Sequence, residues 1–283
     1  ALPICYILAG YSYSIISGDK TENCIGFEDF WMVKVDSTGN VQWDNTIGGT
    51  GQDLYCSVVQ TSDDGYVIGG WSNSNISGDK TENCLGSYDY WIVKTNSTGN
   101  IQWQNTIGGD ASDYLEIITE STEGELLLGG NTYSDISGDK TEDLNGGAGD
   151  FWVVKTDSIG DTLWTRRYGN TFTDWGTQII PITTTQQYES GYPIQYILTG
   201  GWRDVDDDWE GKLYIAKLDS IGGIIWQKKH TNYTYFGSIQ TPLIVRQGGR
   251  AIGVATFENW YNYPNPVIVS FNADGTIAWK KEV

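Results

Sequence analysis

The chain has 283 residues, of which 39% are hydrophobic and 13% aromatic, so it can bury a substantial core. Its 36 acidic and 17 basic residues give a formal net charge of −19. A surface of that sign repels nucleic-acid phosphates and anionic lipid, and no apolar run reaches the roughly 18 residues that a membrane helix needs. We therefore expect no nucleic-acid partner and no direct membrane insertion.

A repeated segment organises the chain. Residues 16–49 recur at 76–109 with 25 of 34 positions unchanged, and a third copy begins at Ile136. Spacings of 60, 61, 62 and 53 residues between the tryptophans near the ends of the copies indicate one structural unit used five times. These tryptophans are Trp43, Trp103, Trp164, Trp226 and Trp279.

Each full unit contains four short strand signals separated by turn residues. Runs rich in Val, Ile, Tyr and Trp, bounded by Gly, Asp and Ser, are typical of strands. In the second unit the expected strands cover residues 55–60, 66–71, 90–95 and 100–104. No segment longer than ten residues shows helical periodicity, so we expect an all-β fold.

The connection between the third and fourth strands is the most regular feature of the repeat. An Asp or Asn opens it in every copy and a Gly follows in fourth place, which is typical of a type I turn closed by a glycine bulge. The five turns begin at Asp36, Asn96, Asp157, Asp219 and Asn272. The third and fourth strands are therefore predicted to be adjacent and antiparallel.

The third strand is apolar on both faces, as in residues 30–33 and 151–154, whereas a strand covered on one side would alternate. Four-stranded sheets buried on both faces and repeated five times predict a β-propeller of five blades, forming one domain over residues 1–283. An open β-solenoid is the alternative. The first unit begins at its second strand, so either the first blade has three strands or the natural protein extends beyond residue 1. The expected repeats cover approximately 1–49, 50–109, 110–170, 171–232 and 233–283.

The four cysteines leave the redox compartment open. Cys5, Cys24, Cys56 and Cys84 allow three complete pairings. Cys24 and Cys84 occupy equivalent places in successive copies, which usually lie farther apart than the roughly 7 Å that a disulfide can bridge. We therefore disfavour that pair and assign no other.

The motifs SGDKTE, D-[FY]-W-x-V-K, G-N-[VI]-Q-W and T-I-G-G resemble the extracellular β-propeller repeat proteins of Bacteroidota. The resemblance covers nearly the whole chain and is strongest over residues 10–160. It implies cargo of the type IX secretion system, hence a location outside the cell or on its outer surface. The turn and tryptophan pattern also resembles quinoprotein-type propellers, in which the tryptophan wedges between blades. We expect that structural role for all five repeat tryptophans.

Catalytic motifs are scarce in this sequence. It has one histidine, His230, and lacks the G-x-S-x-G, H-E-x-x-H, C-x-x-C and phosphate-loop patterns. Most carboxylates recur at fixed repeat positions, whereas an active site needs one asymmetric cluster. We therefore expect a non-enzymatic secreted or cell-surface propeller that binds a protein or glycan, as in adhesion. The alternatives are a multivalent lectin with sugar sites between blades and a carbohydrate-active enzyme with convergent carboxylates of raised pKa.

The candidate ligand-binding residues lie in loops. The three SGDKTE loops offer oxygen-rich sites for Ca²⁺ or sugar hydroxyls, or else their acids hold the loop to backbone amides: Asp19, Glu22, Asp79, Glu82, Asp139 and Glu142. The acidic run at 204–208 is either a calcium site or a solvated loop, with Asp204, Asp206 and Asp208 as its candidate ligands. Loop aromatics serve sugar stacking, a protein hot spot or buried anchoring: Trp175, Trp209, Trp260, Tyr261 and Tyr263.

Overall fold

The structure is a computed structural model, and its description covers most of the chain. The described ranges are 5–121, 124–146, 149–171, 174–182, 194–202, 212–230, 244–246, 250–259 and 262–282. Within them the regular elements are strands joined by turns, which confirms the all-β prediction. In this part of the chain there is no helix with the length and hydropathy required to traverse a bilayer.

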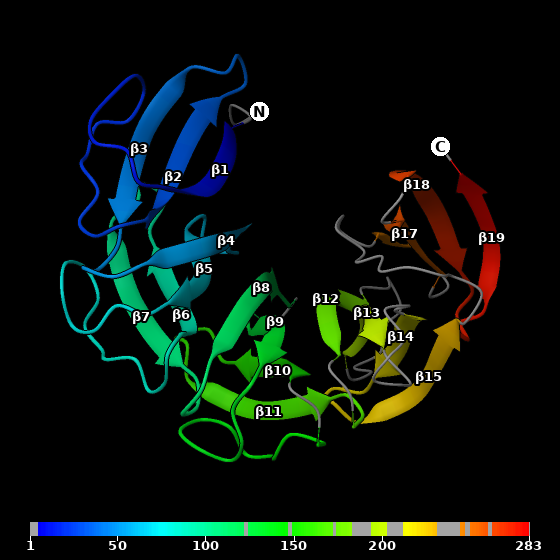
Figure 1. Ribbon diagram of the computed structural model, residues 1–283. Coiled ribbons are helices and arrows are strands. Elements are labelled where there is room, and N and C mark those ends of the chain that lie inside the picture. The colour runs from blue at the N-terminus through cyan, green and yellow to red at the C-terminus, as the bar shows by residue number, and fades with distance from the viewer. Residues whose placement is uncertain are drawn as a thin grey trace. The chain divides into compact units, whose positions relative to one another are not determined.

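The strands form five sheets in which strands consecutive in the chain are neighbours (Figure 1). Strand pairing is antiparallel, as in β5 with β6, where Trp71 lies opposite Tyr90. The first sheet contains β1 (Cys5–Ser12), β2 (Asp29–Asp36) and β3 (Val41–Ile47). The second contains β4 (Asp53–Gln60), β5 (Tyr66–Ser72), β6 (Asp89–Thr95) and β7 (Ile101–Ile107). The third contains β8 (Asp113–Glu120), β9 (Leu126–Thr132), β10 (Asp150–Thr156) and β11 (Thr162–Tyr168).

The last two sheets have the same strand order. The fourth contains β12 (Trp175–Ile182), β13 (Gln195–Trp202), β14 (Lys212–Leu218) and β15 (Ile224–His230). The fifth contains β16 (Ile244–Arg246), β17 (Arg250–Asn259), β18 (Asn262–Phe271) and β19 (Ile277–Glu282). Small antiparallel meanders repeated along the chain make the architecture propeller-like.

The chain divides into two compact units, each with its own core. One comprises residues 1–128, 132–143 and 155–163, and the other comprises 129–131, 144–154 and 164–283. In the first unit a buried cluster lies between the first and second sheets, where Phe30 stacks on Trp91 with ring centroids 5.3 Å apart. In the second unit a cluster around Ile215 and Phe271 joins the fourth and fifth sheets.

Local chemistry sets the turns between third and fourth strands. Gly39 and its four counterparts have φ between 78° and 91°, the left-handed region that favours glycine. The Asp36 carboxylate accepts hydrogen bonds from the Thr38 hydroxyl at 2.7 Å and from the amides of Thr38 and Asn40 at 2.8 and 3.0 Å, which holds its pKa well below the usual range. The strand register shifts by one residue beside each of the four turns whose pairing is described, as a glycine bulge requires.

A tryptophan and a glycine join successive sheets. A Cβ built at Gly99 would lie 3.3 Å from the Trp43 ring, and one at Gly160 would lie 2.7 Å from Trp103. The same contact joins Trp164 to Gly222 and Trp226 to Gly275. A polar group beside each indole reaches the carbonyl of the same glycine, as Asn45 does at Gly99 (2.7 Å). The last repeat tryptophan, Trp279, is 47% exposed.

Candidate functional site

The SGDKTE loops use their charged groups to hold strands in place. Lys80 is buried, donates to the Thr106 hydroxyl and lies 5.1 Å over the Trp91 ring. Glu82 accepts the Thr106 amide at 2.6 Å, and Asp79 accepts the amide of Gly48 in the preceding sheet at 3.2 Å. Burial raises the Asp79 pKa.

The other two loops repeat much of this arrangement. Glu22 accepts the amide of Thr46 at 2.7 Å, and Asp139 accepts that of Gly108 at 3.1 Å. Asp19 and Glu142 lie at the equivalent positions of the first and third loops. The predicted loop carboxylates are thus spread over three sheets and do not form one cluster.

A second repeated group of acids is buried at the strand starts. Asp89 begins β6 with no exposed surface, and its Oδ2 accepts the amides of Leu85 and Gly86 at 2.6 and 3.2 Å. A Cβ built at Gly108 would lie 2.0 Å from Asp89 Oδ1, so the first glycine of T-I-G-G leaves room for this carboxylate. Burial raises the Asp89 pKa. The same glycine contact recurs for Asp29 and Asp150.

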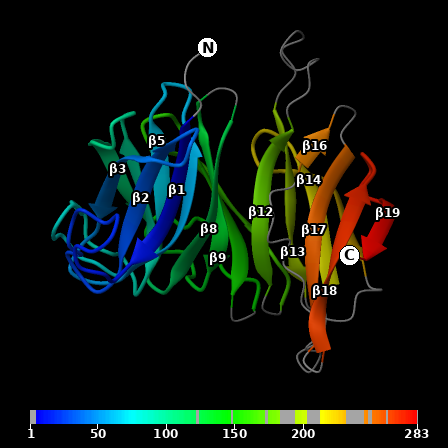
Figure 2. The same ribbon diagram turned by 90° about the horizontal axis from the view of Figure 1, so that it is seen from above.

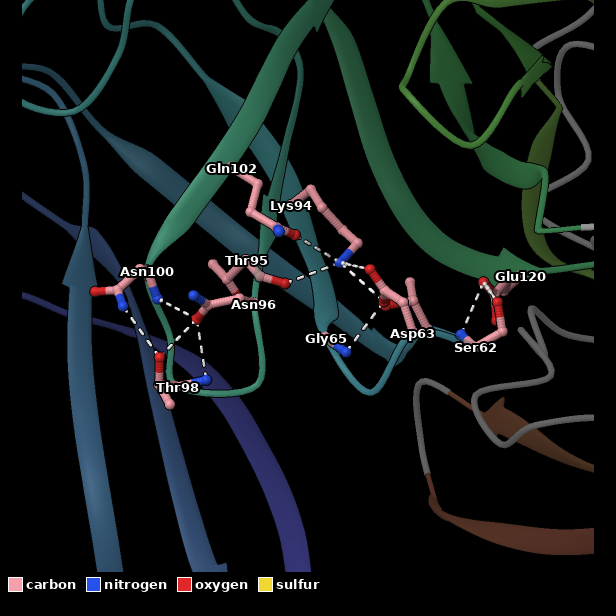
Figure 3. Close-up of polar contacts among 11 residues, drawn as sticks. Ser62, Asp63, Gly65, Lys94, Thr95, Asn96, Thr98, Asn100, Gln102 and Glu120 are labelled. Atoms are coloured by element: carbon pink, nitrogen blue, oxygen red, sulfur yellow. Dashed lines mark hydrogen bonds and ion pairs between the residues drawn. The ribbon is translucent and has the colours of Figure 1, made fainter.

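A polar network lies at the C-terminal end of β6, the end opposite Asp89 (Figure 3). The Lys94 ammonium is 5% exposed and lies 2.9 Å from Asp63 Oδ2, with the Thr95 carbonyl and Gln102 Oε1 each at 3.0 Å. A hydrogen bond from the Thr61 hydroxyl and, second to it, the bond from Lys94 hold the Asp63 pKa at about 2. Glu120 of β8 accepts the Ser62 amide at 3.1 Å and so ties this turn to the third sheet. The lysine is already fully coordinated, which makes this network structural.

Five aromatic side chains of the first unit form what we call the aromatic cluster: Tyr55, Trp71, Tyr88, Tyr114 and Tyr133. Trp71 lies at its centre, with ring centroids 4.9 Å from Tyr88, 5.1 Å from Tyr114 and 6.2 Å from Tyr55. Tyr133 joins through Tyr114 at 5.8 Å. All five rings are partly exposed, and Tyr55 is 55% exposed. The cluster therefore brings five partly exposed aromatic side chains together at one place.

Tyr55 is held there by an unusual backbone. Its φ is +56°, which is uncommon for a residue with a bulky side chain. It lies in a bulge of β4, because the pairing with β5 skips from Leu54 to Ser57. A Cβ at Gly70 would lie 1.9 Å from the Tyr55 carbonyl oxygen, so that glycine admits the bulge. Such strain is concentrated at functional sites.

A carboxyl group with a shifted pKa lies beside the cluster. Burial raises the Glu116 pKa to about 7, and no hydrogen bond to its side chain is present among the described residues. Glu116 acts electrostatically on the buried Tyr90 hydroxyl. Tyr90 lies directly opposite Trp71 in the β5–β6 pair, and Tyr114 of β8 contacts Trp71. Glu116 and Tyr114 therefore approach the same face of the second sheet.

A second carboxylate approaches from the first sheet. The Tyr88 hydroxyl donates to Gln52 Oε1 at 2.7 Å, and Gln52 Nε2 donates to Glu28 at 3.1 Å. This chain of hydrogen bonds fixes the Tyr88 ring against Trp71 and places Glu28 at the edge of the cluster.

The aromatic cluster and Glu116 occupy positions at which neighbouring copies of the repeat differ. The second unit has Leu54 where the third has Tyr114, and Cys56 where the third has Glu116. Asn73 takes the place of Tyr133, and Glu28 that of Tyr88. These residues could not be predicted from what the copies share. The signal was in the differences between otherwise nearly identical copies.

Comparison with known proteins finds relatives by structure alone. No family model and no curated protein matches the sequence. A variant of Synechocystis apocarotenoid oxygenase superposes with a TM-score of 0.50 at 9% identity, covering 99% of this chain and 58% of that chain. An ACO/RPE65 chimera superposes with a TM-score of 0.51 at 10% identity and the same coverage. The chain thus spans little more than half the length of these structures, and the similarity is one of fold.

This comparison corrects two expectations. The prediction of a non-enzymatic binding or adhesion module is wrong, and so is the statement that the chain is no enzyme, because the structures that share its fold are enzymes. The expectation relied on a repeated scaffold lacking an asymmetric cluster. The aromatic cluster with Glu116 supplies that asymmetry.

Of the remaining candidate residues, some lie outside the described part of the chain and the others lie in strands. Asp204, Asp206, Asp208, Trp209, Trp260 and Tyr261 lie outside the described residues. Trp175 begins β12 and Tyr263 lies in β18. His230 Nε2 contacts the Gly275 carbonyl oxygen at 3.1 Å, which gives it the bridging place that Asn45 has in the first sheet. The four cysteines are free thiols.

Within the described ranges no group of three His, Cys, Asp or Glu side chains could hold a metal ion. The expectations about calcium, export, location and partners stay predictions.

Proposed function

We propose that the chain is an enzyme that acts on carbohydrate by acid–base catalysis at the aromatic cluster. The observation that carries this proposal is a carboxyl group with a pKa of about 7, Glu116, beside partly exposed aromatic rings at positions where neighbouring copies of the repeat differ. Sugar rings stack on indole and phenol faces, and glycoside cleavage needs a carboxylic acid that stays protonated near neutral pH.

The residues divide into binding and proton-transfer roles. Trp71 and Tyr114 provide the stacking surface, and the hydroxyls of Tyr55 and Tyr88 are suited to hydrogen-bond a polyhydroxylated substrate. Glu116 is the proton donor below pH 7, because its pKa lies near the working range of a general acid. Glu28 is the second carboxylate, the partner that glycosidases require as base or nucleophile.

The oxygenase reaction of the structural neighbours is not assigned to this chain. At 9% to 10% identity, the likeness supports the fold and not the reaction.

A panel of chromogenic glycosides and soluble polysaccharides tests the proposal. We expect hydrolysis that declines above pH 7, as Glu116 ionises. Glu116→Gln should lower kcat by at least about 100-fold with little change in KM, and Trp71→Ala should mainly raise KM. Glu120→Gln, on the same strand, is the matched control. Full activity of Glu116→Gln, or the same loss in Glu120→Gln, would refute the assignment.

We also propose that the five sheets are the blades of one closed propeller. Four successive tryptophan–glycine contacts support this proposal. Two members of the series have no such contact: Trp279 is 47% exposed, and Gly39 has no described atom within 4 Å of its Cβ position. Small-angle X-ray scattering should give a radius of gyration of about 19 Å, the value for a compact chain of this length. A clearly larger value, typical of two loosely linked bodies, would contradict closure.

A further inference from the structure

Among the described residues, β1 forms an edge of the first sheet, which has one strand fewer than each of the other four sheets (Figures 1 and 2). In the second sheet, β5 is the counterpart of β1, and β4 pairs with it from Asp53 opposite Ser72 to Gln60 opposite Tyr66. An edge strand presents unpaired N–H and C=O groups to solvent. The free side of β1 therefore offers a row of backbone hydrogen-bonding groups for one more strand.

The space that such a strand would fill is kept clear by a glycine. At Gly70 of β5, a Cβ would lie 1.9 Å from the Tyr55 carbonyl oxygen and 2.2 Å from that of Leu54, so the bulge of β4 requires glycine. Gly10 is the equivalent residue of β1, and no described atom lies within 4 Å of its Cβ position. Glycine is thus present on β1 without the bulged strand that requires it on β5.

A hydroxyl group on β1 also lacks the carboxylate acceptor that the equivalent hydroxyl has in the second and third sheets. Ser72 is fully buried, and its hydroxyl is hydrogen-bonded to the Asp53 carboxylate at the start of β4. Thr132 and Asp113 repeat this bond in the third sheet. The corresponding residue of β1 is Ser12, which is partly exposed. Its oxygen accepts the Ser14 amide at 3.0 Å, and among the described residues its hydroxyl has no acceptor.

We propose that the free edge of β1 binds an extended peptide segment that begins with aspartate and continues with β-branched aliphatic residues. The Asp carboxylate accepts the Ser12 hydroxyl, a two-residue bulge passes over Gly10, and the rest pairs with β1 as far as Tyr6. This register is the one that β4 adopts on β5. Addition of a strand to a sheet edge draws affinity from main-chain hydrogen bonds and specificity from side chains at fixed positions.

A peptide with the sequence of residues 51–60, carrying Cys56→Ser and a fluorophore, tests the proposal by anisotropy against the full chain. We expect a Kd on the order of 10 μM, since a short flexible peptide must be ordered on binding. The control peptide carries Val58→Pro, which removes a ladder donor, and should bind at least tenfold more weakly.

Two substitutions in the chain locate the bound peptide. Gly10→Val should abolish binding while the melting temperature stays within about 2 °C, because its Cβ position is open. Replacing the peptide's Asp53 with Ala should weaken binding to the wild-type chain about tenfold, and Ser12→Ala should erase that difference.

Absence of binding at millimolar peptide would overturn the proposal. So would equal binding to the Gly10→Val variant, or a Val58→Pro peptide that binds as well as the parent. Self-association of the chain that Gly10→Val removes, with no peptide bound to the wild type, would assign the edge to a second copy and also overturn the proposal.

Discussion

Single carboxyl groups in this protein differ in pKa because their surroundings differ. Asp36 and Asp63 lie at turns where amides, hydroxyls or an ammonium stabilise the charged form, and both pKa values are lowered. Asp89 and Glu116 are desolvated, and both pKa values are raised. The two groups of acids therefore act on stability in opposite directions as the pH changes.

Glu116 should make the protein less stable at neutral pH and above than in mild acid. Its folded pKa of about 7 exceeds the ordinary 4.5, so its stabilising contribution is complete below pH 4.5 and is lost as the pH rises through 7. The loss amounts to at most about 3 kcal/mol. Glu116→Gln should match the wild type at pH 5 and exceed it at pH 8 in chemical denaturation. Parallel pH profiles of the two proteins would show that Glu116 is ionised in the folded state.

The glycine beside Asp89 should tolerate no side chain. Because a Cβ at Gly108 would lie 2.0 Å from a buried carboxylate oxygen, Gly108→Ala should cost about 3 kcal/mol or more through overpacking and disturbed hydrogen bonds. Gly10→Ala is the control, since its Cβ position is open. Equal melting temperatures for the two variants would contradict the packing assigned to T-I-G-G.

At the scale of elements, the sequence predicts what depends on local chemistry. The turns that begin at Asp36 and Asn96 could be predicted because the Asx side chain and the following glycine determine them within five residues. The double burial of β6 could be predicted from its uninterrupted apolar run. The aromatic cluster could not, because Trp71, Tyr88 and Tyr114 come from three segments whose proximity depends on pairing and on a bulge.

The polar end of β6 should stabilise the second sheet. Lys94→Met removes the donor shared by Asp63, Gln102 and a backbone carbonyl, and should cost about 1–3 kcal/mol at pH 7. Lys34→Met, at the same place in the first sheet, removes one bond of 3.2 Å to the Ser97 carbonyl and should cost less.

The stability of the Lys94→Met variant as a function of pH separates the ion pair from packing in this network. The lowered pKa of Asp63 contributes stability above pH 3.8 that is lost as the pH falls through about 2. The deficit of Lys94→Met should therefore shrink in acid. A deficit that is constant from pH 7 to pH 2 would mean that lost packing, and not the ion pair, explains it.

For the whole molecule, one contact repeated between neighbouring sheets explains why the repeat is conserved in shape while its loops diverge. Four of the five indoles, those of Trp43, Trp103, Trp164 and Trp226, pack on a turn glycine of positive φ, and a neighbouring polar group caps the carbonyl of that glycine. The contact leaves the first-strand residues free to vary. Consequently Glu116 and Tyr114 could replace Cys56 and Leu54 without loss of the scaffold.

The tryptophan at the end of the series tests whether the scaffold closes. Trp103→Ala should cost about 3–5 kcal/mol, because it empties a packed site between two sheets. In a closed propeller, Trp279 has an equivalent site on the Gly39 turn, so Trp279→Ala should cost nearly as much. Its 47% exposure by itself would allow a much smaller loss. Denaturation of both variants decides: a cost below about 1 kcal/mol for Trp279→Ala, beside a large one for Trp103→Ala, would mean that the series of contacts ends at the last sheet.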